Sequence, residues 1–522
     1  MKNNTKIYFP IFLSIATVMG IFIGTNLNFN KNTKMLFGNN AQEAKIKRLI
    51  DFIEYDYVDK VNTDSLLDGT IKNIVSKLDP HSVYIPSKDH DRISEKMNGK
   101  FVGIGIQFRM IKDSLTVINT VKNGPSEKAG IQSGDRILRA NKDTLFGKKL
   151  ESNDIIKHLK GKKNTTVNLS VYRKSTDKNL SFKVKRGEIP IKSIDATYML
   201  TDAIGYIKIN NFTATSYTEF KESLTDLKQI GMQKMVLDLR GNTGGYIGVT
   251  NKIIDEFLPN DKLIVFTKDN KGNIDKSFAT AKGDFENKTV YVLMDENSAS
   301  ASEILAGALQ DNDTGIIVGR RSFGKGLVQH DMPFGDGSSV RLTTARYYTP
   351  TGRSIQKPYK LNGKNAYYKD DFEKRYYSGE LTSADSIKVN DSLKFYTPKG
   401  KTVYGGGGII PDVFVGLDTS NTFRFNFNAM NVFVFNYIDE NRKDFKNVEL
   451  SQFLANFDSN NAIFKQFLKE FKKYRSNKKH DKEIKFYLKA NFARELYDDN
   501  GFYQVLNTDD KMIQKVLALE ND

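Results

Sequence analysis

Four short apolar runs between residues 205 and 320 are the feature that most constrains the fold of this chain. Their sequences are GYIKIN, KMVLDL, KTVYVLM and GIIVGR, and stretches with helical spacing lie between them, at 217–230, 247–257 and 300–309. Apolar runs of strand length that alternate with helices are typical of an α/β fold with a parallel sheet. The carboxyl ends of such strands gather at one edge of the sheet, so we expect functional residues in the loops that follow these runs.

The chain has 522 residues, enough for several domains, and we predict an α/β multidomain protein. Its five segments differ in pattern: an apolar N-terminal segment (1–24), a linker followed by two helical stretches (25–99), a β-rich region with two helices (100–186), the α/β region (187–418) and a helical, amphipathic C-terminal extension (419–522). Asp79-Pro80 is predicted to end the second helical stretch, because proline cannot continue a helix.

The N-terminal segment has the pattern of a membrane helix. Residues 7–24 (IYFPIFLSIATVMGIFIG) are uncharged and follow Lys2 and Lys6. Their length is near the ~18 residues that cross a bilayer, and the preceding positive charge favours an N-terminus in the cytoplasm and the remainder outside. We predict a retained single-pass membrane anchor. A cleaved signal peptide is the alternative, although no A-x-A-like cleavage site follows closely.

The charge pattern does not favour nucleic acid as a partner. Lys and Arg number 79 against 62 Asp and Glu, which gives a net charge of +17. Acidic residues are mixed among the basic ones, even within the densest basic run at 472–485, so we interpret the charge as solvated surface. The chain has no cysteine, and its five histidines lack H-E-x-x-H spacing. We therefore expect neither a metal nor a cofactor.

The strongest candidate site follows the apolar run that ends at Met294. There a predicted helix begins within the serines of NSASASE, and Ser300 with Glu303 matches the S-x-x-E capping box. Ser300 is therefore either a helix cap or a nucleophile. At a helix start the free backbone N–H groups and the helix dipole could hold an oxyanion. On the local pattern alone, the cap is the simpler interpretation.

A serine nucleophile needs a base, and Lys325 is the candidate. It lies between two glycines after the next apolar run, so a parallel sheet would bring it to the same edge as Ser300. A lysine acts as a base only when uncharged, which requires a pKa lowered by burial. An ordinary surface lysine is the alternative.

The same stretch also matches a phosphate loop, G-x-x-x-x-G-K, at 319–325. However, Gly326 stands where Ser or Thr should hold Mg²⁺, and the following LVQHDMPF reads as a strand ending at Pro333. A second glycine turn, DLRGNTGG at 238–245, follows another apolar run and could offer backbone amides to an anion.

Eight segments in order resemble one protein family, the carboxyl-terminal processing peptidases or tail-specific proteases. They cover roughly residues 45–418 and read LDPHSVYIP (78–86), FVGIGIQF (101–108), GPSEKAGIQSGDRIL (124–138), DLRGNTGG (238–245), NSASASEILAGALQD (297–311), VGRRSFGKGLVQ (318–329), YYTPTGRSIQKP (347–358) and GGGGIIPDV (405–413). The resemblance implies a PDZ domain inserted ahead of a Ser-Lys protease core. The predicted anchor and the extension at 419–522 depart from soluble members.

The resemblance also implies roles for single residues. They are Ser300 as nucleophile, Lys325 as general base, Gln329 as the residue that orients the lysine, Gly244 with the Ala301 backbone as oxyanion hole, and Gly103, Ile104, Gly105 and Ile106 as the peptide-binding loop of the PDZ domain. Asp311 matches a family acid, which we interpret as structural support.

These observations lead us to expect an exported serine endopeptidase that cleaves proteins with free C-terminal tails. We place its catalytic part on the periplasmic side of the cell membrane, held there through residues 7–24. The sequence leaves an oligomer open. A non-catalytic PDZ scaffold of the cell envelope and a phosphate-loop nucleotide hydrolase are the alternatives.

Overall fold

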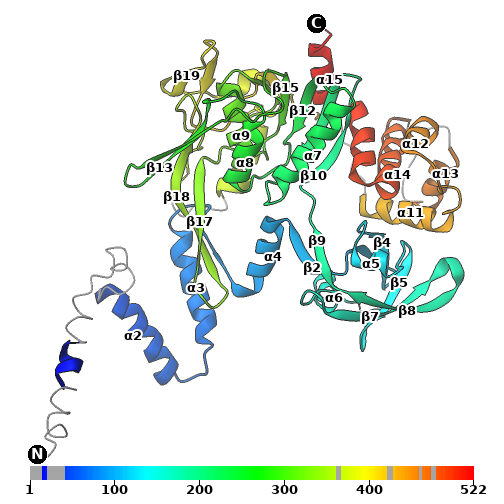
Figure 1. Cartoon of the computed structure of the whole chain (residues 1–522), viewed down its shortest axis with the longest axis horizontal. Coiled ribbons are helices and arrows are strands. Elements are labelled where there is room, and N and C mark those ends of the chain that lie inside the picture. Colours follow the sequence, from blue (N-terminus) through cyan, green and yellow to red (C-terminus); the bar gives the residue numbers. More distant parts are fainter. Residues whose placement is uncertain are drawn as a thin grey trace, which may run out of the picture. The chain divides into compact units, whose positions relative to one another are not determined.

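The computed structural model describes residues 14–19, 41–147, 149–359, 366–419, 427–457, 461–471 and 478–521. The chain divides into two compact units, 1–73 and 74–522. The first unit holds a short helix at 14–19, α2 (Ala41–Asp56) and most of α3 (Thr63–Ser76) (Figure 1). The two helical stretches predicted before Asp79-Pro80 are therefore confirmed.

The predicted membrane segment at 7–24 is described only at 14–19, and its other residues lie outside the described ranges. Among the helices that the structure does describe, none has both the length and the apolar character needed to cross a bilayer. The membrane anchor stays a prediction.

The β-rich domain forms around an antiparallel sheet with strand order β3-β4-β5-β7-β8, in which β6 also pairs with β5. Its alternating apolar residues meet in one core, in which Leu115, Val117 and Val171 have no exposed surface. The entry and exit strands pair, since Gly103 lies opposite Gly187. The elements are β2 (Lys100–Gly103), β3 (Ile106–Ile111), β4 (Ser114–Thr120), α5 (Pro125–Lys128), β5 (Asp135–Ala140), β6 (Asp143–Thr144), α6 (Ser152–Leu159), β7 (Thr166–Arg173), β8 (Lys178–Lys185) and β9 (Gly187–Pro190).

The α/β domain contains the predicted parallel sheet, with strand order β10-β11-β12-β15-β16-β21. The strands from β11 to β21 are parallel, and β10 runs antiparallel at one edge. The sheet strands are β10 (Ile194–Met199), β11 (Ile204–Ile209), β12 (Lys234–Asp238), β15 (Val290–Met294), β16 (Gly315–Gly319) and β21 (Val413–Phe414).

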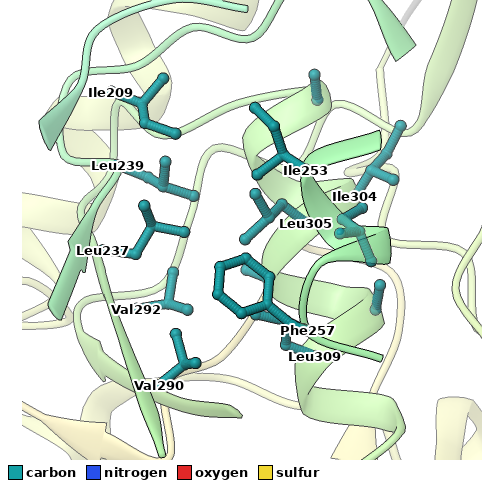
Figure 2. Close-up of a cluster of buried hydrophobic side chains, with 14 of the residues drawn as sticks. Ile209, Leu237, Leu239, Ile253, Phe257, Val290, Val292, Ile304, Leu305 and Leu309 are labelled. Carbon is teal, nitrogen blue, oxygen red and sulfur yellow. The ribbon is translucent and has the colours of Figure 1, made fainter. Parts of the chain in front are cut away.

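Both faces of this sheet are covered. On one face α7 (Ser216–Gln229), α8 (Ile247–Asp255) and α9 (Ala301–Asp311) bury apolar side chains against alternate strand residues. Figure 2 shows Leu237 and Val292 of the sheet facing Leu305 of α9. The opposite face packs against α15 (Lys511–Leu519), whose Ile513 is 1% exposed. The last helix of the chain therefore forms one of the three layers.

A second sheet carries residues that reach the candidate site. Its order is β1-β18-β13-β14, and β17 also pairs with β18. Gln329 of β17 lies opposite Thr343 of β18. Among these strands, the sequence pattern predicts only β17. The elements of this region are β1 (Val83–Ile85), α4 (Ser87–Asn98), β13 (Leu263–Asp269), β14 (Ile274–Phe278), β17 (Leu327–Pro333), β18 (Ser339–Tyr348), a π-helix (Ala366–Asp370), α10 (Asp371–Tyr377), β19 (Lys394–Tyr396) and β20 (Thr402–Tyr404).

The C-terminal extension is helical, as predicted. Its first helices pack around Phe433, Phe467 and Phe492 in a separate core. The backbone leaves helical geometry at Tyr497 and Asp498, where α14 is kinked. The helices are α11 (Phe427–Glu440), α12 (Leu450–Asn456), α13 (Asn461–Glu470), α14 (Lys478–Leu506) and α15.

Candidate active site

A cleft of about 1390 Å³ brings together most of the residues singled out in the sequence. The predicted site residues that line it are Ser300, Lys325, Gln329, Gly244, Gly103, Ile104, Gly105 and Ile106. Ala301, the residue that follows Ser300 in the sequence, is fully buried. The β-rich domain and the α/β domain thus share one cleft.

Ser300 stands at the start of α9 with an unusual backbone. Its φ is 56° and its ψ is −114°, whereas an ordinary N-cap residue is extended. A non-glycine residue held in such a region costs of order 1–3 kcal/mol, and strain of this kind clusters at functional sites. Ser300 is the N-cap of α9 and forms a capping box with Glu303, and it also has the strained backbone that is common at functional sites.

Lys325 has the environment that a base requires. Burial, helped by the nearby positive charge of Arg341, lowers the pKa of Lys325 to about 8. Its Nζ donates to Gln329 Oε1 at 2.8 Å. The Nε2 of Gln329 in turn donates to the backbone carbonyl of His81 at 2.7 Å. Gln329, a residue of β17, thus holds the side chain of Lys325 in place.

Two buried groups tie Ser300 to Lys325. The backbone N–H of each residue donates to the same oxygen, Glu303 Oε2, at 2.8 Å. The hydroxyl of Tyr347 lies 3.1 Å from the carbonyl oxygen of Ser300 and 2.6 Å from that of Lys325. These contacts hold the two backbones side by side, although Ser300 and Lys325 come from different loops.

Glu303 is more than the helix cap that the sequence suggested. It is fully buried, and its other oxygen accepts from Ser322 Oγ at 2.5 Å and from Gly324 N at 2.7 Å. Burial raises the pKa of Glu303 to about 7, although these donors favour its ionised form. The sequence pattern assigns no role to Tyr347. Only its position in the YYTPTG segment, which carries part of the family resemblance, could have indicated one.

The glycine turn after β12 contacts the start of α9. Gly244 has φ 101°, and a Cβ there would lie 2.8 Å from Ser300 Cβ and 2.9 Å from Ala301 N, so a side chain does not fit. The Gly244 N–H donates to Asn242 Oδ1 at 2.8 Å. A substrate oxyanion would therefore have to share or replace this bond if it used Gly244 as a donor.

The loop of the β-rich domain reaches the cleft at Gly103–Ile106. Gly105 has φ 72°, and a Cβ there would lie 2.9 Å from the Ile189 side chain. Ile104 packs into the core of its domain at 3% exposure, and Ile106 is half-buried. Both also line the cleft.

The phosphate-loop alternative finds no support in this geometry. A phosphate loop requires a helix after its lysine, but the strand β17 follows Lys325. His330, next to Gln329, is exposed, and its Nδ1 lies 2.6 Å from Thr344 Oγ1. Asp311 pairs with Arg353 at 2.6 Å deep in the core, which fits the structural support expected of it.

Comparison with protein families matches four parts of the chain. Peptidase family S41 matches residues 203–362, and the PDZ domain family matches 102–184. The N-terminal domain of the activating protease CtpB matches 23–89, and a family of unknown function matches 425–498. The β-rich domain is therefore a PDZ domain, and the α/β domain contains the S41 protease core.

Several known proteins are similar to this chain over much of their length. Carboxy-terminal processing protease CtpB of Bacillus subtilis is 35% identical over 319 residues, which are 60% of this chain but only 65% of that protein. The carboxy-terminal-processing protease of Bartonella bacilliformis is 33% identical over 352 residues, 66% of this chain and 80% of that protein. A probable CtpA-like serine protease of Staphylococcus haemolyticus is 32% identical over 366 residues, 68% and 72% respectively.

Among solved structures, a photosystem II D1 C-terminal processing protease matches with 22% identity and a TM-score of 0.37, over 72% of this chain and 88% of that one. The matches to the S41 and PDZ families agree with the names of the curated relatives. The chain belongs to the carboxy-terminal processing proteases, the PDZ-containing serine peptidases of family S41.

Proposed function

We propose that this protease cleaves peptide bonds by acyl transfer, with Ser300 as nucleophile and Lys325 as general base. Neutral Lys325 takes the proton of Ser300 Oγ as that oxygen attacks the peptide carbonyl. The C–N bond then breaks, and the leaving amine takes the proton back from the Lys325 ammonium. Water, deprotonated by the same lysine, hydrolyses the acyl-enzyme and restores Ser300.

The observation that carries this proposal is the strained backbone of Ser300 next to Lys325, a half-buried lysine with a lowered pKa. Strained strand-to-helix turns present nucleophilic serines in other hydrolases. Glu303 accepts the backbone N–H groups of both Ser300 and Lys325, and the single hydroxyl proton of Tyr347 is shared between their two carbonyl oxygens. A non-catalytic PDZ scaffold would need neither the strain nor the lowered lysine pKa.

We further propose that the PDZ loop selects substrates by their C-terminal carboxylate. A glycine-bearing loop ahead of a strand can offer backbone N–H groups to a carboxylate, and the strand edge can take the peptide as an added strand. Because Gly103–Ile106 and Ser300 line the same cleft, a bound tail would lie near the catalytic serine. Proteins and peptides with free C-termini are therefore the proposed substrates.

The proposed location is the cell membrane, with the catalytic part on the periplasmic side. The support comes from the sequence, in which Lys2 and Lys6 precede the uncharged residues 7–24.

Covalent trapping tests the nucleophile. A fluorophosphonate should label the intact protein at Ser300, as read by mass spectrometry of the labelled peptide, and Ser300→Ala should neither react nor cleave a peptide substrate. Ser298→Ala and Ser302→Ala are the controls. Both hydroxyls are fully buried and bond to backbone carbonyls, so their loss costs only about 0.5–1.5 kcal/mol of stability and activity should persist. Cleavage by pure Ser300→Ala protein would reject the assignment.

A further inference from the structure

The LDPHS segment, at 78–82, lies before the PDZ domain in the chain and bonds Gln329 through the carbonyl of His81. Asp79, His81 and Ser82 are buried, with 7%, 5% and 1% exposure. Asp79 Oδ1 accepts the backbone N–H of His81 at 2.7 Å and that of Ser82 at 2.8 Å. Its Oδ2 accepts Ser82 Oγ at 2.5 Å. The carboxylate thus closes a tight turn on itself.

This turn contacts the catalytic residues through one backbone atom. The carbonyl oxygen of His81 accepts from Gln329 Nε2. A carbonyl can only accept, and the amide of glutamine has one donor end and one acceptor end. The His81 carbonyl therefore decides which way the Gln329 amide points, and it turns Oε1 toward Lys325.

A fixed Gln329 oxygen has a consequence for the lysine amine. Oε1 takes one N–H of Lys325, so the amine cannot rotate freely about its last bond. Its lone pair, which must accept the proton of Ser300, is then directed away from Gln329. Without the His81 carbonyl, the amide could flip and offer its NH₂ group to that lone pair.

The turn is also fixed to the sheet that carries Gln329. Ser82 Oγ accepts the backbone N–H of Thr343 at 3.1 Å, and Thr343 is the residue paired with Gln329 between β17 and β18. The ring of His81 packs edge-on against Tyr367 and Tyr368, with centroid separations of 5.0 and 5.7 Å. The bond from Thr343 to Ser82 and the packing of the His81 ring thus fix the position of the His81 carbonyl relative to Gln329.

We propose that Asp79 is a positioning residue for the catalytic base. Its carboxylate holds the turn at 79–82, the turn places the His81 carbonyl, and that carbonyl orients Gln329 against Lys325. This inference rests on the proposed role of Lys325. It gives the segment before the PDZ domain a part in catalysis, although Asp79 itself touches neither substrate nor reacting atoms.

The charged groups around Lys325 set the direction of the expected pH effect. Arg341 of β18 lowers the pKa of the lysine, whereas Glu303 of α9 and Asp79 raise it. Removal of the Asp79 charge therefore lowers the pKa of Lys325, and release of the Gln329 oxygen acts in the same direction because that oxygen stabilises the ammonium. Since the base works when neutral, the rise of activity with pH should move to lower pH.

The test compares Asp79→Ala with Asp79→Asn in the full-length protein, by kcat, KM, melting temperature and the pH dependence of kcat/KM. Asp79→Ala should lower kcat about 10- to 100-fold with little change in KM, since general-base catalysis contributes about 10²–10⁴-fold. Asparagine at position 79 keeps a side-chain oxygen that can accept the backbone N–H groups of His81 and Ser82. Asp79→Asn should therefore recover most of kcat while the pH profile stays shifted, and it remains informative if the alanine variant folds poorly.

Asp336→Ala is the matched control. Asp336 accepts Ser338 N at 2.7 Å and Ser338 Oγ at 2.6 Å in the turn between β17 and β18, which is the same kind of turn without a bond to Gln329. This variant should keep the wild-type pH profile and kcat. If the pH dependence of kcat/KM is unshifted in both Asp79 variants, the turn has only a structural role and the proposal is overturned. A lower melting temperature does not change this conclusion.

Failure of the base assignment is distinguishable from failure of this inference. If Lys325→Ala cleaves as the wild type does, the base assignment fails and the inference fails with it. If Lys325→Ala is inactive while the Asp79 variants match the wild type in kcat and pH profile, the inference alone is wrong.

Discussion

The charge state of Lys325 is the residue-scale property on which the proposed chemistry depends. A pKa of about 8 leaves roughly a tenth of the lysine neutral at pH 7 and most of it neutral at pH 9. Burial is the main cause of the lowered pKa, and the nearby positive charge of Arg341 adds to it. The only bond from Nζ among the described side chains runs to the neutral Gln329 amide, which does not fix a charge as a carboxylate would.

Substitution of this lysine should abolish activity even where the positive charge is kept. Arginine does not lose its proton in the working pH range, so Lys325→Arg and Lys325→Ala should both be inactive, while the wild-type kcat/KM should rise about tenfold between pH 7 and pH 9. Initial rates with a peptide substrate at a series of pH values provide the measurement. His330→Ala is the control and should keep most of the activity. An active Lys325→Arg beside an inactive, folded His330→Ala would reverse the two roles.

At the scale of elements, the sequence predicted the strands and helices of the parallel sheet because their apolar patterns are local. It could not predict that Tyr347 of β18 would contact Ser300 and Lys325, or that the His81 carbonyl would bond Gln329, since those contacts join segments far apart in the chain. Nor did β14 stand out, because most of its residues are polar and exposed, whereas β13 begins with the apolar run LIVF, which could have indicated it. The sequence pattern predicts only a local capping role for Glu303, and it does not indicate the bonds of Glu303 to Gly324 and Lys325.

The last helix illustrates the same limit, because its amphipathic pattern does not reveal what its apolar face covers. In the structure α15 covers the second face of the central sheet, against Tyr206 and Leu293 among others. Arg240, in the turn that leads to Gly244, also bonds Asp510 at the start of α15 at 2.6 Å. The last helix of the extension is thus part of the protease core.

Removal of apolar atoms from α15 should therefore destabilise the whole protease. Ile513 is 1% exposed, and Ile→Ala in a core costs about 2–5 kcal/mol. Ile513→Ala should lower the melting temperature and the midpoint of urea unfolding. Lys515→Ala, on the exposed side of the same helix, is the control and should leave both unchanged. Equal stability of the two variants would show that α15 does not belong to the folded core.

At the scale of the whole molecule, the extension also contacts the PDZ domain. Asp439 of α11 pairs with Arg136 at 3.0 Å, and Phe435 packs against Ile111 and Ile118. Since α15 covers the protease sheet, one extension contacts both of the domains that line the cleft. It can therefore hold the PDZ loop at a set distance from Ser300, which is what a protease needs if it binds a tail at one place and cuts at another.

Recognition of a terminal carboxylate predicts that amidated substrates are cut slowly. A carboxamide lacks the charge that the N–H groups of Gly103–Ile106 would bind, and a charge-assisted hydrogen bond contributes about 1.5–3 kcal/mol. At limiting substrate the cleavage rate of an apolar-ended peptide should fall roughly 10- to 100-fold on amidation. A third peptide, amidated but carrying a glutamate near its end, keeps the net charge and separates specific recognition from general attraction to a protein of net charge +17. We expect it to be cut as slowly as the amide. Equal rates for the acid and the amide would leave Gly103–Ile106 as an ordinary turn, and rescue by glutamate would replace a carboxylate-binding loop with long-range electrostatics.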